Sequence, residues 1–346
     1  MLTKDQVMEV LKTVKDPHLH KSIEETNGVR EMKITDSFVS LKVALAKINT
    51  AEQMKVQQEI VHKLKEKGAE SVGLRFEALS EEDIADLGGV PEAGPSLLSK
   101  ESKTVFIAVA SGKGGVGKST VSVNLAVALQ RMGKKVGILD ADIYGFSVPD
   151  MMGIEDRPKV EGKTIIPVER FGVKVISMGF FVEDNSPVIW RGPMLGKMLN
   201  NFFSEVDWGD LDYLILDLPP GTGDVAMDIH TMLPHCKEII VTTPHPTAAF
   251  VAARAGAMAI KTEHDILGVI ENMSYFESKK TGEIEHVFGQ GGGEKLSEVL
   301  GTELLGQIPL GQPYEQSGFF APSVYSEDHP TGQKYLDIAK KVSEKL

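Results

Sequence analysis

The sequence predicts an α/β protein: a P-loop-type domain with a mostly parallel sheet flanked by helices, preceded by a small α/β domain. Three observations support this. The chain has 346 residues, of which 42% are hydrophobic, enough for two packed cores. Apolar runs alternate with helical segments through its second part. A stretch rich in glycine and proline separates that part from the first. The same composition excludes disordered and collagen-like chains.

The first 80 residues predict a domain with the order helix, strand, strand, helix, strand. Thr3 and Gln6 form a capping-box pattern, and apolar residues then recur at helical spacing until Asp16-Pro17 ends the helix. Alternation of apolar side chains marks the strands. The expected strands are 29–34, 39–45 and 72–76, and the expected second helix is 56–64.

Residues 81–103 predict a linker between the two domains. The stretch contains glycines, prolines and acidic residues and has no apolar periodicity, which is typical of linkers. The alternative is a long ordered loop, which is uncommon inside compact domains. We therefore expect domains at 1–80 and 104–346.

The second domain contains short continuous apolar runs, each typical of a strand buried on both faces. Such strands belong to a parallel sheet covered by helices. The expected strands are 105–110, 136–139, 173–176, 213–216, 239–243 and 267–270.

A phosphate-binding loop follows the first of these strands directly. It fits the pattern G-x-x-x-x-G-K-[ST] and leads into a predicted helix over 120–131, the context that the motif requires. Its glycines let backbone N–H groups surround phosphate oxygens, Lys118 is expected to reach the β- and γ-phosphates, and Ser119 to bind Mg²⁺. The predicted nucleotide-binding residues are Gly112, Lys113, Gly114, Gly115, Val116, Gly117, Lys118, Ser119 and Thr120.

Lys113 is an additional lysine at the second position of this loop. In a phosphate cradle it can neutralise charge on a transferring phosphoryl group. The alternative is a solvated surface charge.

Acidic residues follow two of the predicted strands, where ligand-contacting loops of a parallel sheet emerge. Asp140 and Asp142 come after the second strand, and Asp217 ends the strand 213–216. We expect Asp142 to position the attacking water and Asp217 to bind at the Mg²⁺ site. Asp140, Gly221 and Asp224 are expected in nucleotide-sensing switch loops. Capping or salt-bridge roles are the alternatives for each aspartate.

Asn272 follows the strand 267–270. Its amide can read the donor and acceptor edge of adenine, and the alternative is a turn residue. Together these positions predict an ATP-binding and ATP-hydrolysing protein.

Charge and cysteine content limit the remaining function classes. The formal net charge of −12 argues against a dedicated nucleic-acid coat, although a local basic patch remains compatible with it. The single cysteine excludes an intramolecular disulfide and favours a cytosolic chain. No apolar run approaches the ~20 residues needed to span a bilayer. We expect a cytoplasmic protein that does not attach to membranes.

Several of these motifs together resemble the Mrp/ApbC family of P-loop ATPases, relatives of MinD and ParA. The likeness covers nearly the whole chain, because the first 80 residues resemble the iron–sulphur-assembly domain that is often fused there. The motifs that carry it are 112–119, 140–145, 190–194, 216–224, 243–244 and 270–273.

The resemblance implies a homodimer that binds two ATP molecules between its subunits and hydrolyses them slowly. Lys113 would act at the nucleotide across the interface, Asp142 would orient the water, and Asn272 would contact adenine. Ser119 and Asp217 would hold Mg²⁺. Family members carry an iron–sulphur cluster to apoprotein clients.

The sequence departs from this family at the cluster ligands. The family has a C-x-x-C pair shortly after the adenine-binding asparagine, whereas residues 274–283 contain no cysteine. A four-thiolate cluster in a dimer takes two cysteines per chain, and the only cysteine, Cys236, lies elsewhere. The chain therefore resembles a cysteine-poor, SalA-like subgroup, which implies an ATP-gated regulator as the alternative. Such a regulator would bind a protein partner or nucleic acid.

Overall fold

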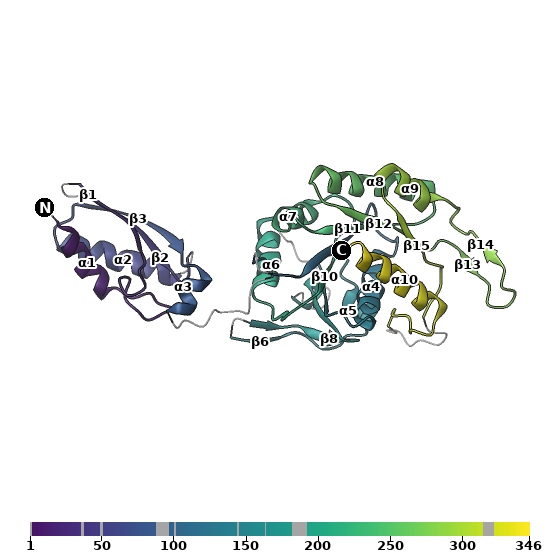
Figure 1. The fold of residues 1–346 in the computed structure, drawn as a ribbon, viewed down its shortest axis with the longest axis horizontal. Helices are drawn as coiled ribbons and strands as arrows, with labels where there is room; N and C mark the ends of the chain where they lie inside the picture. The colour runs from purple at the N-terminus through teal and green to yellow at the C-terminus, as the bar shows by residue number, and fades with distance from the viewer. Residues whose placement is uncertain are drawn as a thin grey trace. The chain divides into compact units, whose positions relative to one another are not determined.

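The computed structural model describes residues 2–35, 38–48, 51–87, 97–99, 102–143, 145–162, 164–181, 192–313 and 322–346. The chain divides into two compact units, Met1–Glu92 and Ala93–Leu346, both drawn in Figure 1. Most of the glycine-rich stretch between them, residues 88–96 and 100–101, lies outside the described residues.

The first unit packs two helices against a three-stranded sheet with the order β1-β2-β3. β1 and β2 are antiparallel, whereas β2 and β3 are parallel. The observed order of the first five elements is the one that the sequence predicts. These elements are α1 (Lys4–Thr13), β1 (Val29–Thr35), β2 (Phe38–Leu45), α2 (Ala51–Glu66) and β3 (Ser71–Ala78).

The first end of this unit shows how local sequence specifies structure, and its second end contains a helix that the sequence did not predict. The amide of Gln6 donates to the Thr3 hydroxyl and the amide of Thr3 to the Gln6 side chain, so the predicted capping box is present. A short helix, α3 (Glu81–Asp86), occupies the start of the predicted linker. The amide of Asp83 donates to the Ser80 hydroxyl at 3.1 Å, and Arg30 pairs with Asp83 at 2.9 Å. The sequence did not predict this helix, because the ion pair with Arg30 that stabilises it joins residues that are distant in sequence.

The second unit contains an eight-stranded sheet with the order β15-β12-β11-β4-β10-β5-β9-β8. All neighbours are parallel except β8 and β9. The six predicted strands are confirmed to within two residues at each end, and the edge strands β8 and β15 are additions. The strands are β4 (Val105–Ser111), β5 (Val136–Asp140), β8 (Val168–Arg170), β9 (Val173–Ser177), β10 (Tyr213–Asp217), β11 (Lys237–Thr242), β12 (Ile266–Glu271) and β15 (Leu304–Gln307).

Helices cover both faces of this sheet, as expected for parallel strands buried on both sides. Side chains of α4, α5 and α10 join one core cluster, and those of α6, α7, α8 and α9 join the other. Figure 1 shows α7, α8 and α9 together on one side of the sheet. The helices are α4 (Lys118–Arg131), α5 (Val148–Met152), α6 (Gly192–Ser204), α7 (Asp224–Met232), α8 (Pro246–Lys261), α9 (Gly292–Leu300) and α10 (Pro330–Glu344).

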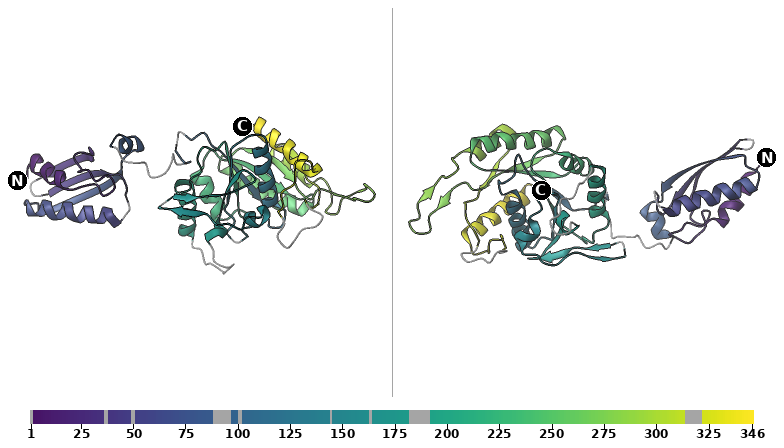
Figure 2. Two further views of the ribbon diagram at one scale, coloured as in Figure 1. Left: turned by 90° about the horizontal axis from the view of Figure 1, so that it is seen from below. Right: turned by 180° about the vertical axis from the view of Figure 1, so that it is seen from behind.

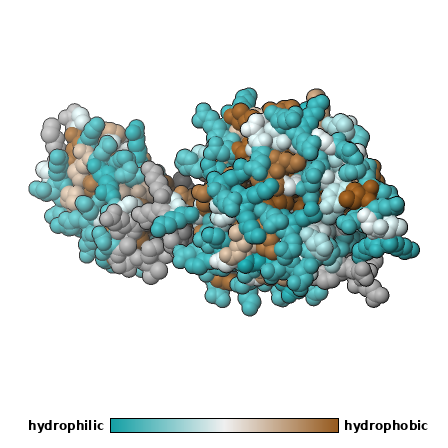
Figure 3. Space-filling view, turned by 45° about the vertical axis from the view of Figure 1, so that its right-hand side comes forward, coloured by the Kyte–Doolittle hydropathy of each residue, from teal (hydrophilic) through white to brown (hydrophobic). Residues whose placement is uncertain are grey.

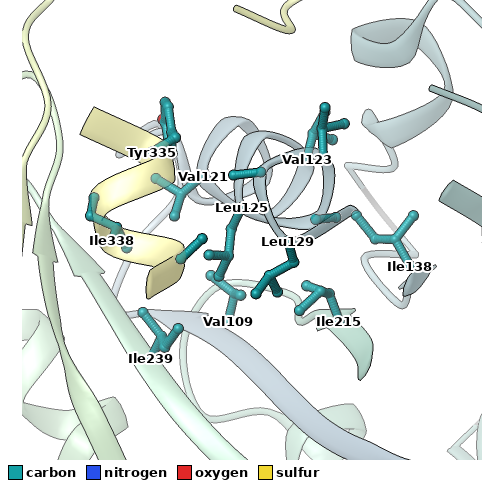
Figure 4. Close-up of a cluster of buried hydrophobic side chains, with 14 of the residues drawn as sticks. Val109, Val121, Val123, Leu125, Leu129, Ile138, Ile215, Ile239, Tyr335 and Ile338 are labelled. Atoms are coloured by element: carbon teal, nitrogen blue, oxygen red, sulfur yellow. The ribbon is translucent and has the colours of Figure 1, made fainter. Parts of the chain in front are cut away.

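Alternation along each strand divides its side chains between the two cores. On β4, Ile107 and Val109 point to the α4 side, whereas Ala108 and Ala110 point to the α8 side. Figure 4 shows Val109 beneath Leu125 of α4.

Smaller elements lie at the margins of the second unit. They are the hairpin β6 (Lys159–Glu161) and β7 (Thr164–Ile166), the 3₁₀ turn Met178–Phe181, and the hairpin β13 (Phe276–Glu277) and β14 (Ile284–Glu285). The β13–β14 hairpin projects from the body of the unit in every view of Figures 1 and 2.

Within the part of the chain that the structure describes, no helix has the length and apolar character needed to cross a membrane.

Candidate functional site

Three neighbouring strands bring the predicted site residues to one edge of the sheet. The central strands are ordered β4-β10-β5, and Asp217 at the end of β10 pairs in register with Asp140 at the end of β5. The loop that follows β4 begins beside them. Because parallel strands end at one edge, residues far apart in sequence converge there.

The loop 112–117 adopts a conformation that depends on glycine. Gly117 has φ of +80°, and a Cβ at this position would lie 2.0 Å from the side-chain nitrogen of Asn272. That nitrogen donates to the carbonyl of Val116 at 2.9 Å. Asn272 is thus a buried brace beneath the loop. Its predicted contact with adenine stays a prediction.

Gly112, at the start of the loop, lies directly against helix α8. A Cβ here would be 2.3 Å from the carbonyl carbon of Val251, closer than any real side chain approaches. Only glycine therefore lets the loop pack on the backbone of this helix.

Asp217 connects the phosphate loop to helix α4 and is fully buried. It accepts hydrogen bonds from Ser119 at 2.5 Å and from Ser122 at 2.6 Å. The ammonium of Lys118 lies 2.8 Å from the same carboxylate. Ser122 is a site residue that the sequence analysis missed, although its place one helical turn after Ser119 is a usable signal.

Asp140 organises the loop that carries Asp142. Its carboxylate accepts from the amides of Asp142 at 3.1 Å and Ser147 at 3.2 Å, and from the hydroxyl of Ser177 at 3.0 Å. Burial, followed by the charge of nearby Asp217, raises the pKa of Asp140 to about 7, against the opposing effect of Lys118. Ser147 and Ser177 were not predicted, because nothing local in sequence links them to Asp140.

Asp142 lies beside the lysine of the loop. One of its carboxylate oxygens is 3.9 Å from the Lys118 ammonium, and the other accepts from the amide of Gly145 at 3.0 Å. The residue is 7% exposed and lines the cavity described next. Its carboxylate is therefore held in place at the boundary between protein and cavity.

A cavity of about 570 Å³ opens above the loop, a size suited to a small ligand such as a nucleotide. Lys113 lines it and is exposed. Asp224, at the start of α7, also lines it. The amide of Gly221 donates to the carbonyl of Ser111 at 2.8 Å, so a phosphate contact through that amide would first require this bond to break.

The structure thus brings most predicted residues to one place. Residues of the 112–119 loop, Asp142 and Asp224 contact the cavity, while Asp140, Asp217 and Asn272 support it from below. Two motif residues, Trp190 and Arg191, lie outside the described residues. The role of each residue toward a ligand stays a prediction.

The donor set suits a hard cation and a phosphate chain. The hydroxyl of Ser119 and the carboxylates of Asp142 and Asp217 are oxygen ligands of the kind that Mg²⁺ prefers. Lys113, Lys118 and the N-terminus of α4 supply positive charge for phosphates.

The β13–β14 region follows Asn272 and has a different character. Residues 281–290 are all exposed, and the hairpin tip is held by the amide of Thr281 donating to the Ser278 hydroxyl at 3.3 Å. Cys236 is buried, and burial raises the pKa of its thiol. Among the residues that the structure describes, no three His, Cys, Asp or Glu side chains form a metal-binding group.

Two family models match the chain. Residues 102–343 match the model described as ParA, NUBPL iron-transfer P-loop NTPase. Residues 4–73 match the model described as iron-sulfur cluster assembly protein.

Relatives and solved structures agree with these matches. An iron-sulfur cluster carrier protein of Bacillus subtilis is 64% identical over 348 residues, covering 100% of this chain and 99% of the relative. One of Mycobacterium leprae is 40% identical, covering 98% and 92%. A nucleotide-binding protein of Archaeoglobus fulgidus, solved with ADP, is 36% identical with a TM-score of 0.53 over 69% of this chain and 88% of its own. The MinD ATPase of Pyrococcus furiosus, at 21% identity and a TM-score of 0.52 over 70% and 99%, shares the fold.

Proposed function

Because the chain belongs to the NUBPL family of iron-transfer P-loop NTPases, we propose that it is an Mg²⁺-dependent ATPase that works as a homodimeric switch. The observation that carries this proposal is the arrangement around Asp217. One buried carboxylate holds both the lysine and the serine of the phosphate loop, at the edge of a cavity large enough for a nucleotide.

Each side chain of the loop has a defined task in this proposal. Phosphate oxygens entering the cavity compete with Asp217 for the Lys118 ammonium, which lies within reach of both. Bound Mg²⁺ would be held by Ser119 and Asp217, and it would supply charge neutralisation for the β- and γ-phosphates. Asp142, fixed by Gly145 and Lys118, orients the attacking water.

The position of Lys113 supports the homodimer. This lysine is exposed on the loop and lines the cavity mouth, so its ammonium can serve a nucleotide in its own subunit or in a facing one. A lysine supplied from a facing subunit would couple hydrolysis to assembly, as an arginine finger does when it is supplied in trans.

The relatives are named as carriers of an iron–sulphur cluster, but this chain lacks the residues that usually hold one. A cluster held between two subunits needs two thiolates from each. The hairpin contains none, and Cys236 is buried away from it. Hydroxyl and carboxylate groups such as Ser278 and Glu277 are hard donors that suit iron–sulphur clusters poorly. The residues therefore do not fit a thiolate-held cluster.

Steady-state hydrolysis tests the ATPase. Purified protein should release phosphate from ATP in the presence of Mg²⁺ and lose this activity when EDTA removes the metal. Absence of both nucleotide binding and turnover would overturn the proposal.

Anaerobic reconstitution with iron and sulphide tests the cargo. We expect the native chain to retain far less than one cluster per dimer. A matched variant with Ser278→Cys and Thr281→Cys supplies two thiolates per chain at the hairpin tip, and its iron content and visible absorption should rise. Stoichiometric iron in the native protein would contradict our interpretation.

A second candidate is an ATP-gated regulator, which the cysteine-free hairpin favours. In this case the dimer would bind a protein or nucleic-acid partner rather than deliver iron. Its test is partner binding whose affinity changes when ATP is added. The pairs Lys134-Lys135 and Lys279-Lys280 are the basic sites to mutate first.

A further inference from the structure

Exposed hydrophobic side chains concentrate in one stretch of the sequence of the second unit. Among the described residues, 13 large hydrophobic side chains are exposed, and seven of them lie between residues 250 and 299. Contiguous exposed apolar surface marks an interaction site more often than scattered residues do. Figure 3, which brings the β13–β14 side forward, shows hydrophobic patches within a largely hydrophilic surface. The seven residues are Phe250, Ile260, Phe276, Ile284, Val287, Phe288 and Val299.

The first feature of this region is a groove between α8 and α9. Its cavity measures about 690 Å³, and Phe250, Ala253, Leu296 and Val299 line it. Phe250 is 69% exposed. Of the residues that line the groove, all of them within the described ranges, only Lys295 carries a charge.

The second feature is the hairpin itself, residues 276–288. Its two strands are two residues long each, and a two-stranded hairpin alone is marginally stable in water. Ile284 is 57% exposed, with Val287 and Phe288 close behind it in sequence. A hairpin with so little packing of its own has apolar side chains available to a partner.

The two features are complementary in charge. Glu277, Glu283 and Glu285 flank the apolar residues of the hairpin strands, whereas the groove presents Lys295 and, beside it, Arg254 stacked on Phe250. Lys280 at the hairpin tip has acidic counterparts in Glu294 and Glu298, which lie on α9 outside the groove lining.

We propose that the β13–β14 hairpin of one chain docks into the α8–α9 groove of a second copy, and that the second copy returns the same contact. A two-fold dimer makes such an exchange self-complementary. This inference adds a specific interface to the proposed homodimer. It rests on the proposed function only because it requires a second copy of the chain.

The topology favours a second copy over the same chain. Gln290 and Gly291, which closely follow the hairpin, line the groove, so the hairpin ends at the rim of its own groove. The hairpin itself projects away from the body of the unit (Figures 1 and 2). The hairpin follows β12 and the groove begins after β11, so both lie at the sheet edge that carries the nucleotide loop. Two copies facing each other at this edge bring each hairpin toward the opposite groove.

Mixing experiments test the exchange in full-length protein. A hairpin variant (Ile284→Asp with Val287→Asp) and a groove variant (Phe250→Asp with Val299→Asp) alter exposed residues only. By light scattering over a concentration series in Mg²⁺-ATP, each variant alone should self-associate at least about tenfold more weakly, the cost of ~1.4 kcal/mol. An equimolar mixture should recover part of this loss, because the mixed dimer keeps one intact contact. Ile260→Asp, exposed on α8 outside the groove, is the matched control.

Cysteine cross-linking gives the second readout. Cys236 is buried and does not compete, so Ile284→Cys and Phe250→Cys in one chain should form a disulfide-linked dimer on oxidation. A cross-linked monomer would mean that the hairpin folds onto its own groove, which would overturn the inference. Unchanged self-association of both variants would also overturn it, and a persistent ATP-dependent dimer in that case would leave the proposed function intact.

Discussion

The loops after β4 and β12 leave the same edge of one sheet, yet they are specified in opposite ways. Lys118 and Ser119 are buried and held by Asp217, whereas residues 281–290 are all exposed. Hydrogen bonds and ion pairs within the chain hold the conformation of the first loop, whereas few such contacts hold the second. We therefore expect that substitutions of potential ligand residues in the hairpin leave the nucleotide site undisturbed.

We expect the largest effect on ATP turnover from a substitution in the buried nucleotide loop. Lys118→Ala removes the ammonium that faces the phosphates, and we expect ATP turnover to fall by at least 10²- to 10³-fold, roughly the cost of losing one preorganised charge contact. Phosphate release under saturating ATP measures it. The control is Lys159→Ala, an exposed lysine of β6. Turnover within a few-fold of the native rate would remove Lys118 from the site.

Asp142→Ala should separate binding from hydrolysis. The carboxylate is placed to orient water, so we expect turnover to fall by on the order of 10²-fold with ATP affinity nearly unchanged. Calorimetry and a hydrolysis assay on the same sample report the two quantities. Asp150→Ala, exposed on α5, is the matched control. Equal losses of affinity and turnover would indicate a structural role.

Asn272 links the two loops under comparison, because its side chain supports the nucleotide loop and its backbone leads into the hairpin. Asn272→Ala leaves the Val116 carbonyl without its partner, a cost of ~1–3 kcal/mol, and should weaken ATP affinity about tenfold. Comparing ATP with GTP distinguishes its roles. A brace lowers both affinities equally, whereas an adenine contact lowers ATP affinity selectively.

The last prediction concerns stability against pH and not ATP binding or turnover. The pKa of Asp140 is raised to about 7, so the folded state keeps a proton that the unfolded state releases near pH 4. This contribution to the free energy of unfolding is fully present below pH 4 and declines by roughly a few kcal/mol as the pH rises to 7.

Melting temperature against pH measures this decline. Asp140→Asn should flatten the curve between pH 4 and 7, whatever its effect on absolute stability, while Asp150→Asn should keep the native slope. An unchanged slope in Asp140→Asn would assign the proton uptake to another group.

The sequence predicted well what depends on local order. The six buried strands and the loop 112–119 are continuous patterns, and parallel topology then places Asp140 beside Asp217. What it missed depends on contacts between distant segments. Examples are the bond from Ser177 to Asp140 and the brace from Asn272 to Val116. Neither donor differs, in its own sequence neighbourhood, from an ordinary strand-end or turn residue.

Gly112 has a consequence that reaches beyond the loop. It packs on the backbone of α8 at Val251, while the adjacent Phe250 lines the groove on the outer side of the same helix. A single helix therefore separates the nucleotide loop from the groove. By thermodynamic linkage, any occupant of the groove that changes ATP affinity must have its own affinity changed by ATP by the same factor.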